Sequence, residues 1–292
     1  MGYSSRYHAA SLAAVLVALA VGILIGAALG SDVITGTAED LEKDLGEDLD
    51  QLRADKSDLE DDLAAERDFE QQIYPQVVAD TLAGRTVALV AVGPVDTQAM
   101  SDEVRAAVEP AGAELGEVAT LRVPPDTDEL IEALRPNADR TIPRGDALTA
   151  VARRAGQELL GGEDLGEARG ALFASYSGNP DDVTAAIVVR AESEDLSPRE
   201  QADTELLEEA FIDGLKDGGG TVVAAERADD DPSQIEFFAD RGLSSVDNVD
   251  TVAGKVALVL VLSGAEGSYG IKDTADSLLP DLVAPGEGSA RP

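Results

Sequence analysis

The chain has 292 residues, no cysteine and a formal net charge of −36, which arises from 58 acidic and 22 basic residues. The missing thiols exclude disulfides, thiolate catalysis and cysteine-ligated metals. The negative charge repels the phosphates of nucleic acids, so we expect no nucleic-acid partner. Apolar residues make up 44% of the chain, which is typical of a folded protein rather than a disordered one.

The acidic excess has two interpretations. Carboxylates gathered in one place would capture cations, whereas carboxylates spread over the surface keep a protein solvated. The acidic residues run along the whole length of this chain. Their distribution favours the solvated surface.

Residues 9–30 form an apolar run of 22 residues without a charge. A helix of this length spans roughly 33 Å, which is close to the hydrocarbon thickness of a bilayer. Arg6 and His8 precede the run, and Asp32 follows it. Positive charge stays on the cytoplasmic side, so we expect a cytoplasmic tail at 1–8 and an extracytoplasmic remainder.

A cleavable signal peptide that ends before Ser31 is the alternative for this segment. The apolar run is longer than the usual core of a signal peptide, which favours an uncleaved signal-anchor. Gly22, Gly26 and Gly30 recur every four residues and would let two membrane helices approach closely. The same glycines also fit the ordinary composition of membrane spans.

Residues 38–74 predict an acidic coiled coil. From Leu45 onward, residues separated by three or four positions form a heptad seam: Leu45, Leu49, Leu52, Lys56, Leu59 and Leu63. A lysine at a core position would disfavour higher oligomers and fix the register. With the membrane segment, this pattern predicts a homo-oligomer on a stalk. The alternative is an isolated amphipathic helix that lies on its own domain.

Residues 84–280 predict an α/β domain with a three-layer, mostly parallel sheet. Four continuous apolar runs read as buried strands, as in a sheet covered on both faces: 86–92, 185–189, 221–225 and 256–262. A further strand is predicted at 114–123. Helical patterns lie between the runs and include residues 127–135 and 146–159. The tail, 281–292, is expected to be disordered.

Two helix starts are predicted from capping sequences. Ser197-Pro198-Arg199-Glu200 has the pattern of a capping box with proline at the first helical position. Asp231-Pro232-Ser233-Gln234 has a related pattern. The acidic run Asp229–Asp231 is then explained most simply as a helix N-terminus, where the helix dipole favours negative charge.

The ordered set of segments resembles the MctB-type mycobacterial copper transport proteins. The likeness lies in residues 7–26, in the charged coiled coil, in the Phe69 to Gln72 join, in the strand that follows Gly84, and in residues 245–251 and 267–272 near the C-terminus. The resemblance covers most of the chain. It implies an actinobacterial envelope protein in copper homeostasis, with copper as the transported ion; family members are described as channel-forming proteins of the outer membrane that limit copper accumulation.

Copper prefers thiolate, thioether and imidazole ligands. This chain offers one histidine, His8, and two methionines, Met1 and Met100. A copper site would therefore have to use carboxylates or form across subunits. No resident cofactor is expected.

Two loops are candidate binding sites. Gly267 and Gly270, with Lys272, form a glycine-rich turn after the last predicted strand, and such a turn can hold an anion on its backbone N–H groups. The alternative is a tight turn in which the glycines adopt positive φ. Asp247 and Asp250 are candidate ligands for a hard cation, although such residues in a loop more often form turns and caps.

No catalytic motif is present, because cysteine is absent and the only histidine precedes the membrane segment. We therefore expect no enzymatic activity. The leading hypothesis is a membrane-anchored envelope protein with a role in copper homeostasis. The alternatives are a coiled-coil scaffold or tether without transport activity, and a domain that binds a ligand at the strand ends of its sheet.

Overall fold

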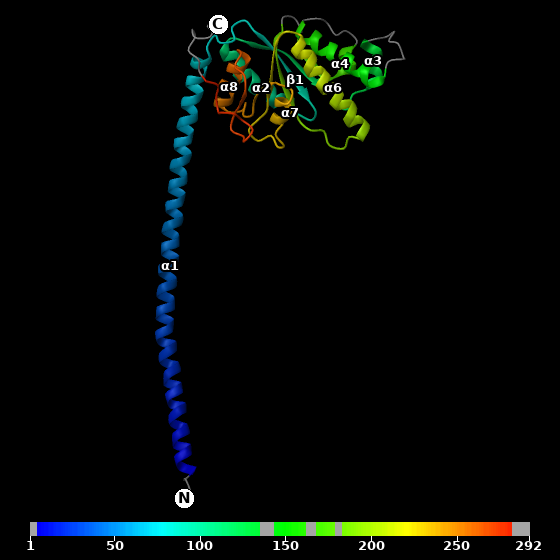
Figure 1. Ribbon diagram of the computed structural model, residues 1–292. Coiled ribbons are helices and arrows are strands. Elements are labelled where there is room, and N and C mark those ends of the chain that lie inside the picture. Colours follow the sequence, from blue (N-terminus) through cyan, green and yellow to red (C-terminus); the bar gives the residue numbers. More distant parts are fainter. Residues whose placement is uncertain (1–4, 135–142, 162–167, 179–182, 282–292) are drawn as a thin grey trace, which may run out of the picture. The chain divides into compact units, whose positions relative to one another are not determined.

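The computed structural model describes residues 5–134, 143–161, 168–178 and 183–281 (Figure 1). Contacts within the chain divide it into two units, Met1–Asp68 and Phe69–Pro292. The predicted domain starts at residue 84, whereas the second unit starts at Phe69 and takes in the end of the first helix. Of the predicted tail at 281–292, all but the first residue lies outside the described residues.

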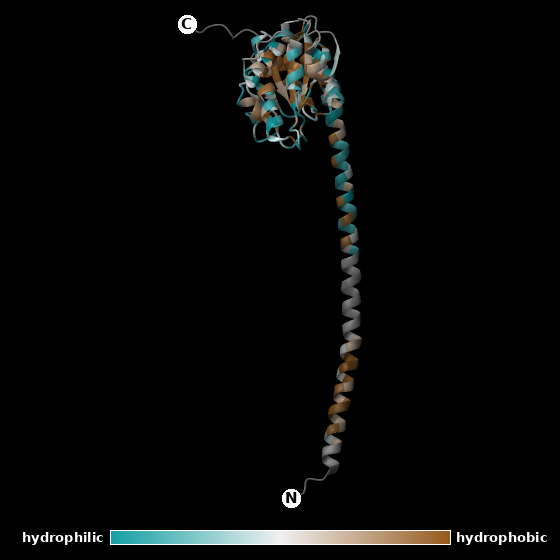
Figure 2. Ribbon diagram, turned by 90° about the vertical axis from the view of Figure 1, so that its right-hand side faces the viewer, coloured by the Kyte–Doolittle hydropathy of each residue, from teal (hydrophilic) through white to brown (hydrophobic). Residues whose placement is uncertain are grey.

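Helix α1 runs without interruption from Ser5 to Val78, over 74 residues. Its segment Ala10–Ala28 is long and apolar enough to cross a membrane, and within the chain no part of that segment is buried. Figure 2 shows this segment in brown. The predicted coiled-coil residues lie on the same helix, and their leucines are exposed in the single chain.

The second unit is a mixed α/β domain built on a seven-stranded sheet. After the end of α1, its elements follow in the order β1 (Thr86–Val92), α2 (Thr97–Val108), η1 (Glu109–Ala111), β2 (Glu114–Leu121), α3 (Thr127–Leu134), α4 (Arg144–Gly161), α5 (Ala168–Leu172), β3 (Phe173–Gly178), β4 (Val183–Arg190), α6 (Pro198–Asp217), β5 (Thr221–Ala225), α7 (Ile235–Ala239), β6 (Ser244–Val246), α8 (Val252–Leu262) and β7 (Ser268–Tyr269).

The strands lie in the order β3-β2-β1-β4-β5-β6-β7. All neighbouring pairs are parallel except β2 and β3, which are antiparallel. The sequence runs outward to one side from β1 and to the other side from β4. The order therefore reverses between β1 and β4, which makes their junction the topological switch point of the sheet.

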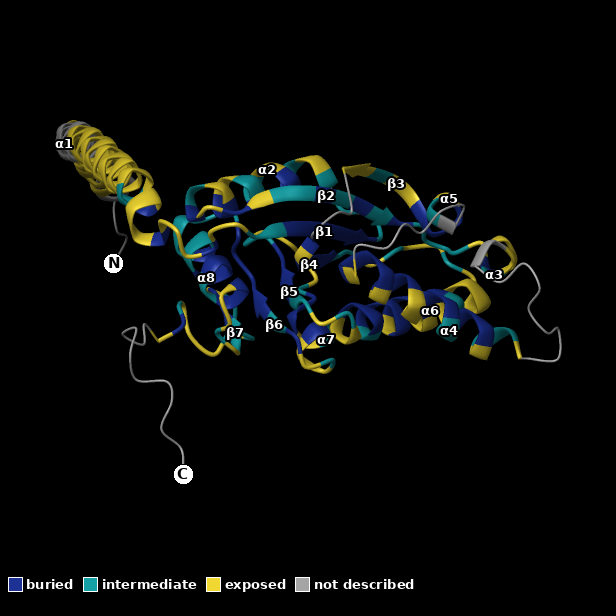
Figure 3. Ribbon diagram, turned by 90° about the horizontal axis from the view of Figure 1, so that it is seen from above, coloured by how far each residue is buried: buried dark blue, intermediate teal, exposed yellow. Residues whose placement is uncertain are grey.

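The sheet is covered on both faces (Figure 3). Strand β1 shows why: alternate residues point to opposite faces, and Val87, Leu89 and Ala91 belong to one core cluster whereas Ala88, Val90 and Val92 belong to the other. Helices α2 and α8 and the end of α1 pack on the first face. Helices α3, α4, α5, α6 and α7 pack on the second face. This arrangement confirms the mostly parallel sheet and its continuous apolar strands.

The run at residues 256–262 was predicted as a strand, and this prediction is wrong, because it forms most of helix α8. Periodicity alone cannot separate a fully buried helix from a buried strand. The helix start had a signal, since Thr251 accepts a hydrogen bond from the backbone N–H of Gly254 and caps the helix. A side chain at Gly254 would overlap the carbonyl oxygen of Asn248, so this glycine permits the tight turn into the helix.

Three strands were missed. β6 and β7 have three and two residues, too short for an alternating pattern, and β3 is a half-exposed edge strand. The capping box at Ser197 is confirmed, with both reciprocal hydrogen bonds present. The predicted helix start at residues 231–234 is wrong, because α7 begins at Ile235 and its preceding residue makes no side-chain cap.

Helices α4 and α6 pack closely because glycines lie where they cross. A Cβ atom at Gly156 would overlap the carbonyl oxygen of Phe211, and one at Gly214 would overlap the backbone of Arg153. The two backbones thus approach more closely than side chains would allow. This contact places the second face of the sheet under a rigid helix pair.

We expect Gly156→Ala to lower the free energy of unfolding by about 2 kcal/mol, because the added methyl group overpacks this crossing. Urea unfolding followed by tyrosine fluorescence would measure the loss. Gly145→Ala is the matched control in the same helix, since a Cβ there meets only Leu206, at an ordinary 3.6 Å. Equal stability of the two variants would contradict the close crossing.

Candidate functional site

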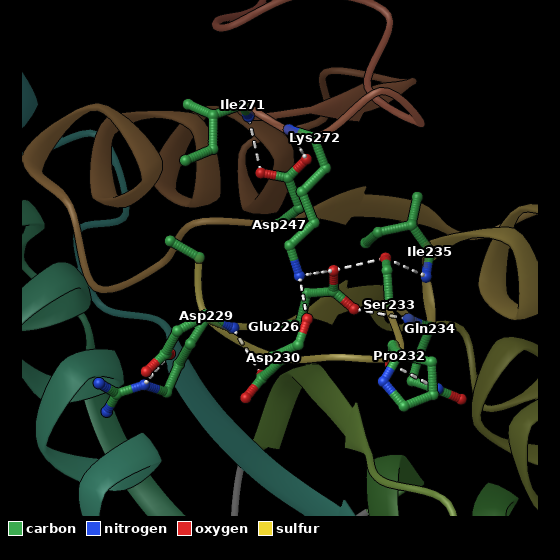
Figure 4. Close-up of polar contacts among 12 residues, drawn as sticks. Glu226, Asp229, Asp230, Pro232, Ser233, Gln234, Ile235, Asp247, Ile271 and Lys272 are labelled. Carbon is green, nitrogen blue, oxygen red and sulfur yellow. Dashed lines mark hydrogen bonds and ion pairs between the residues drawn. The ribbon is translucent and has the colours of Figure 1, made fainter.

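The two loops singled out in the sequence meet each other in the structure (Figure 4). Asp247 directly follows β6 and is fully buried. Its carboxylate accepts hydrogen bonds from the backbone N–H groups of Ile271, at 2.7 Å, and Lys272, at 2.9 Å. The glycine-rich turn therefore does hold an anion on its backbone, and the anion is the side chain of Asp247.

The glycines of this turn adopt positive φ, 134° at Gly267 and 144° at Gly270. A Cβ atom at Gly270 would overlap the Asp247 carboxylate, so only glycine fits there. The turn was predicted to follow a strand. It follows helix α8 instead, and the two glycines flank the short strand β7.

A neighbouring ion pair, between Glu226 and Lys272, holds the same turn in place. Glu226 follows β5, and its side chain is 1% exposed. It accepts hydrogen bonds from Lys272 Nζ at 2.6 Å, from Ser233 Oγ at 2.6 Å and from the backbone N–H of Gln234 at 2.7 Å. We call Glu226, Asp247 and Lys272 the Lys272 cluster. Its donors and acceptors satisfy one another, so it ties the last segment of the domain to the ends of β5 and β6.

The candidate cation ligands are also engaged in structural contacts. Asp250 accepts a hydrogen bond from the backbone N–H of Ala228 at 2.8 Å. Among the described residues, no three His, Cys, Asp or Glu side chains are placed to hold a metal ion together. The acidic run Asp229–Asp231 does not start a helix as predicted. Asp229 instead pairs with Arg227 at 3.2 Å, and this guanidinium lowers the pKa of the Asp229 carboxyl.

Three hollows lined by described residues lie at the carboxyl ends of parallel strands. One hollow of about 310 Å³ is lined by residues that follow β1, β4 and β5. A second, of about 330 Å³, lies between the end of β4 and helix α6, and a third, of about 640 Å³, follows β1 and β2. Ser193 and Glu192 line all three. We call these adjoining hollows the switch-point groove, because they surround the junction of β1 and β4.

Arg190, the last residue of β4, forms a wall of two of these hollows. Its Nε donates to Glu208 at 3.0 Å, its Nη1 donates to Gln234, and its guanidinium lies 4.3 Å from the centre of the Phe237 ring. Burial raises the pKa of the Glu208 carboxyl, although Arg190 opposes the rise. Contacts with Glu208 and Gln234 therefore hold the Arg190 guanidinium in place, so it is not an unpaired charge in the hollows.

The rim of the groove is acidic. Asp96, Glu192, Glu194, Asp230 and Asp231 line the first hollow, against two arginines, Arg190 and Arg227. Gly93 has a φ of 78°, and a side chain there would overlap the carbonyl oxygen of Ala191, so the ends of β1 and β4 come close together. The geometry suits reversible binding of a small polar molecule in a strand-end groove.

Sequence reasoning missed Arg190 and Glu208. The available signal was a charged residue placed directly after a buried apolar strand, since strand ends of a parallel sheet meet at one edge. The partner Glu208 gave a weaker signal, because it is one of several acids on an exposed-looking helix. Nothing in the local sequence marks it as buried.

Lys272→Met should lower the free energy of unfolding by about 3 kcal/mol, because Glu226 would keep its buried charge without a counterion. Lys255→Met is the matched control, since Lys255 Nζ lies 2.7 Å from Glu103, whose side chain is 27% exposed, against 1% for Glu226. We expect a loss of about 1 kcal/mol or less there. Urea unfolding measures both, and equal losses would contradict the structural role of the Lys272 cluster.

No curated protein matches the chain. The family model described as "Copper transport outer membrane protein, MctB" matches residues 3–280. The match includes the apolar helix, the acidic helical segment and almost the whole α/β domain, and this chain therefore belongs to the MctB family of copper transport outer membrane proteins.

Proposed function

We propose that this protein is a non-enzymatic, single-pass envelope protein that supports copper homeostasis by efflux. The observation that carries the proposal is the family match, which covers residues 3–280. The apolar segment Ala10–Ala28 supplies the anchor. Arg6 before it and the acidic residues after it support an orientation with the N-terminus in the cytoplasm and the α/β domain outside.

Copper is the cargo in this proposal, and the donor set limits how the chain can handle it. Soft ligands suit copper best, and the α/β domain offers only the thioether of Met100, which is buried in the core. Direct capture by soft ligands in one domain is therefore a poor explanation. Acidic side chains or sites formed between subunits are better suited to a passing ion.

The proposal includes self-association through α1, because an assembly of several chains can enclose a path for an ion. Gly22 and Gly26 have open space around the position of a Cβ atom in the single chain. Larger side chains at these two positions would not clash with the rest of the chain. The glycines therefore fit a close helix–helix contact, with Gly30 on the same face. The exposed leucines that follow on α1 offer a second contact.

Deletion of the gene should raise cell copper several-fold and reduce growth on added copper, and the full chain should restore both. A chain that begins at residue 31 should fail to restore them, because its domain is no longer held at the membrane. Unchanged growth and unchanged cell copper after deletion would remove the copper role and leave the scaffold alternative.

A second function is favoured by the switch-point groove, which is the usual place for a ligand in an open α/β sheet. The groove adjoins the Lys272 cluster, so a molecule bound there would lie close to the C-terminal segment that this cluster ties to the ends of β5 and β6. Its acidic rim favours a cationic or hydrogen-bonding small molecule. In this reading the copper role depends on a ligand held at the strand ends.

Ser193→Trp should abolish restoration of copper tolerance if the groove is needed, because an indole would fill space shared by all three hollows. Ser263→Trp is the control, since Ser263 is exposed after α8. Circular dichroism of both variants checks that they are folded. Full restoration by a folded Ser193→Trp protein would show that the groove has no part in the copper role.

A further inference from the structure

Five leucines form a stripe along α1, and each is at least 48% exposed in the single chain: Leu45, Leu49, Leu52, Leu59 and Leu63. With Lys56 they recur every three or four residues, which assigns heptad position a to residues 49, 56 and 63 and position d to residues 45, 52 and 59. Such a stripe is more stable when a partner removes it from water.

We infer that the stripe is covered by the same stripe of a second copy of this chain, with the two helices parallel and in register. The inference rests on the self-association proposed above and adds its orientation, its register and the residues that set them. The evidence is the distribution of charge. Residues 45–68 contain ten acidic residues and three basic ones.

All three basic residues lie next to the seam rather than on the outer face of the helix. Arg53 and Arg67 occupy position e, which follows each d, and Lys56 occupies position a. The outer positions b, c and f hold acidic or small and polar residues throughout this stretch. In the single chain Arg53 pairs with Asp50 at 3.0 Å and Lys56 with Glu60 at 3.3 Å. Such exposed pairs contribute little and can form on any face of a helix, so they do not explain why the cations gather at the seam.

In a parallel pair, each g residue faces the e residue five positions further along the other helix. Asp48 then faces Arg53 of the second copy, and Asp62 faces Arg67. Two-fold symmetry makes each of these contacts twice. Four attractive pairs therefore flank the apolar seam.

The remaining pair of this kind would bring Asp55 against Glu60 of the second copy. Lys56 lies at the core position between them, and in the single chain its ammonium is 3.3 Å from Glu60. An a residue also packs beside the preceding g residue of the partner helix, which places Lys56 next to Asp55 of the second copy. The only basic core residue thus stands where the only repulsive contact would form.

An antiparallel pair loses this match. There g residues face g residues, so Asp48 would face Asp62 and Asp55 would face itself. Every such contact is between two carboxylates, and like charges held close together oppose association. The same membrane anchor on both chains also requires the helices to point the same way.

The chain has no cysteine, so single introduced cysteines report on contacts cleanly. In the full chain in detergent, Leu49→Cys and Leu63→Cys should each form same-residue disulfides on mild oxidation. Ser57→Cys, at outer position b, is the control and should stay reduced. Disulfides that form only when Leu45→Cys and Leu63→Cys proteins are mixed would overturn the parallel register, as would reduced thiols at both 49 and 63.

Charge reversal tests the proposed pairs. Arg53→Glu with Arg67→Glu should weaken dimerisation ~10-fold in sedimentation experiments, because four attractive contacts become repulsive. Adding Asp48→Arg and Asp62→Arg should restore it, since those contacts become attractive again and the net charge returns to the original. The matched control adds the same negative charge on the outer face through Ala54→Glu, Ser57→Glu, Ala64→Glu and Ala65→Glu, and should bind normally.

Dimers held by the membrane helices would mask the effect, so the same variants are also measured with Gly22→Ile and Gly26→Ile. Restoration by the four-residue swap in this background supports the proposed pairs. Equal weakening by the outer-face control, or no restoration, would overturn them. A failure here leaves the copper assay untouched, so loss of the register and loss of the copper role can be distinguished.

Discussion

The double burial of β1 and β4 is the constraint on which the domain depends. Val87–Val92 of β1 and Ala185–Val189 of β4 are at most 2% exposed, so both faces of these strands need helices. Parallel pairing forces a crossover between strands, and the crossovers supply those helices. The same constraint leaves only the strand ends near water, which is why Arg190 and the switch-point groove lie there.

The Lys272 cluster is a consequence of the same geometry. An acidic residue directly follows each of β5 and β6, Glu226 and Asp247 respectively, and the parallel register brings these two strand ends to one edge. Two neighbouring buried carboxylates repel one another and lose hydration. The segment at Ile271–Lys272 supplies one ammonium and two backbone N–H groups, so the domain is completed by its last described turns.

Much of this fold could be predicted from the sequence, and the failures have physical reasons. Thr86–Val92 and Thr221–Ala225 are continuous apolar runs, and the sequence alone predicted their bounds. Val256–Leu262 is equally apolar and β-branched, but its neighbours decide its state: Thr251 caps it, and Gly254 lets the backbone turn tightly. The site was harder to predict, because the glycine-rich turn and Asp247 were two separate candidates in the sequence. The backbone N–H groups of Ile271 and Lys272 reach the Asp247 carboxylate only when β6 and β7 pair.

The acidic helix and the acidic domain use their charge differently. In the domain, two buried carboxylates are each matched by a cation, Glu208 by Arg190 and Glu226 by Lys272, and the buried Asp247 is held by backbone N–H groups. In residues 45–68 of α1 the carboxylates stay in water, where a single helix tolerates them at little cost. The acidic outer faces of two such helices repel each other. The helices can still pair if their few cations lie at the seam, and only in the orientation that places these cations against aspartates. Net charge therefore keeps the chain from associating at random, while the positions of Arg53, Lys56 and Arg67 decide which association remains.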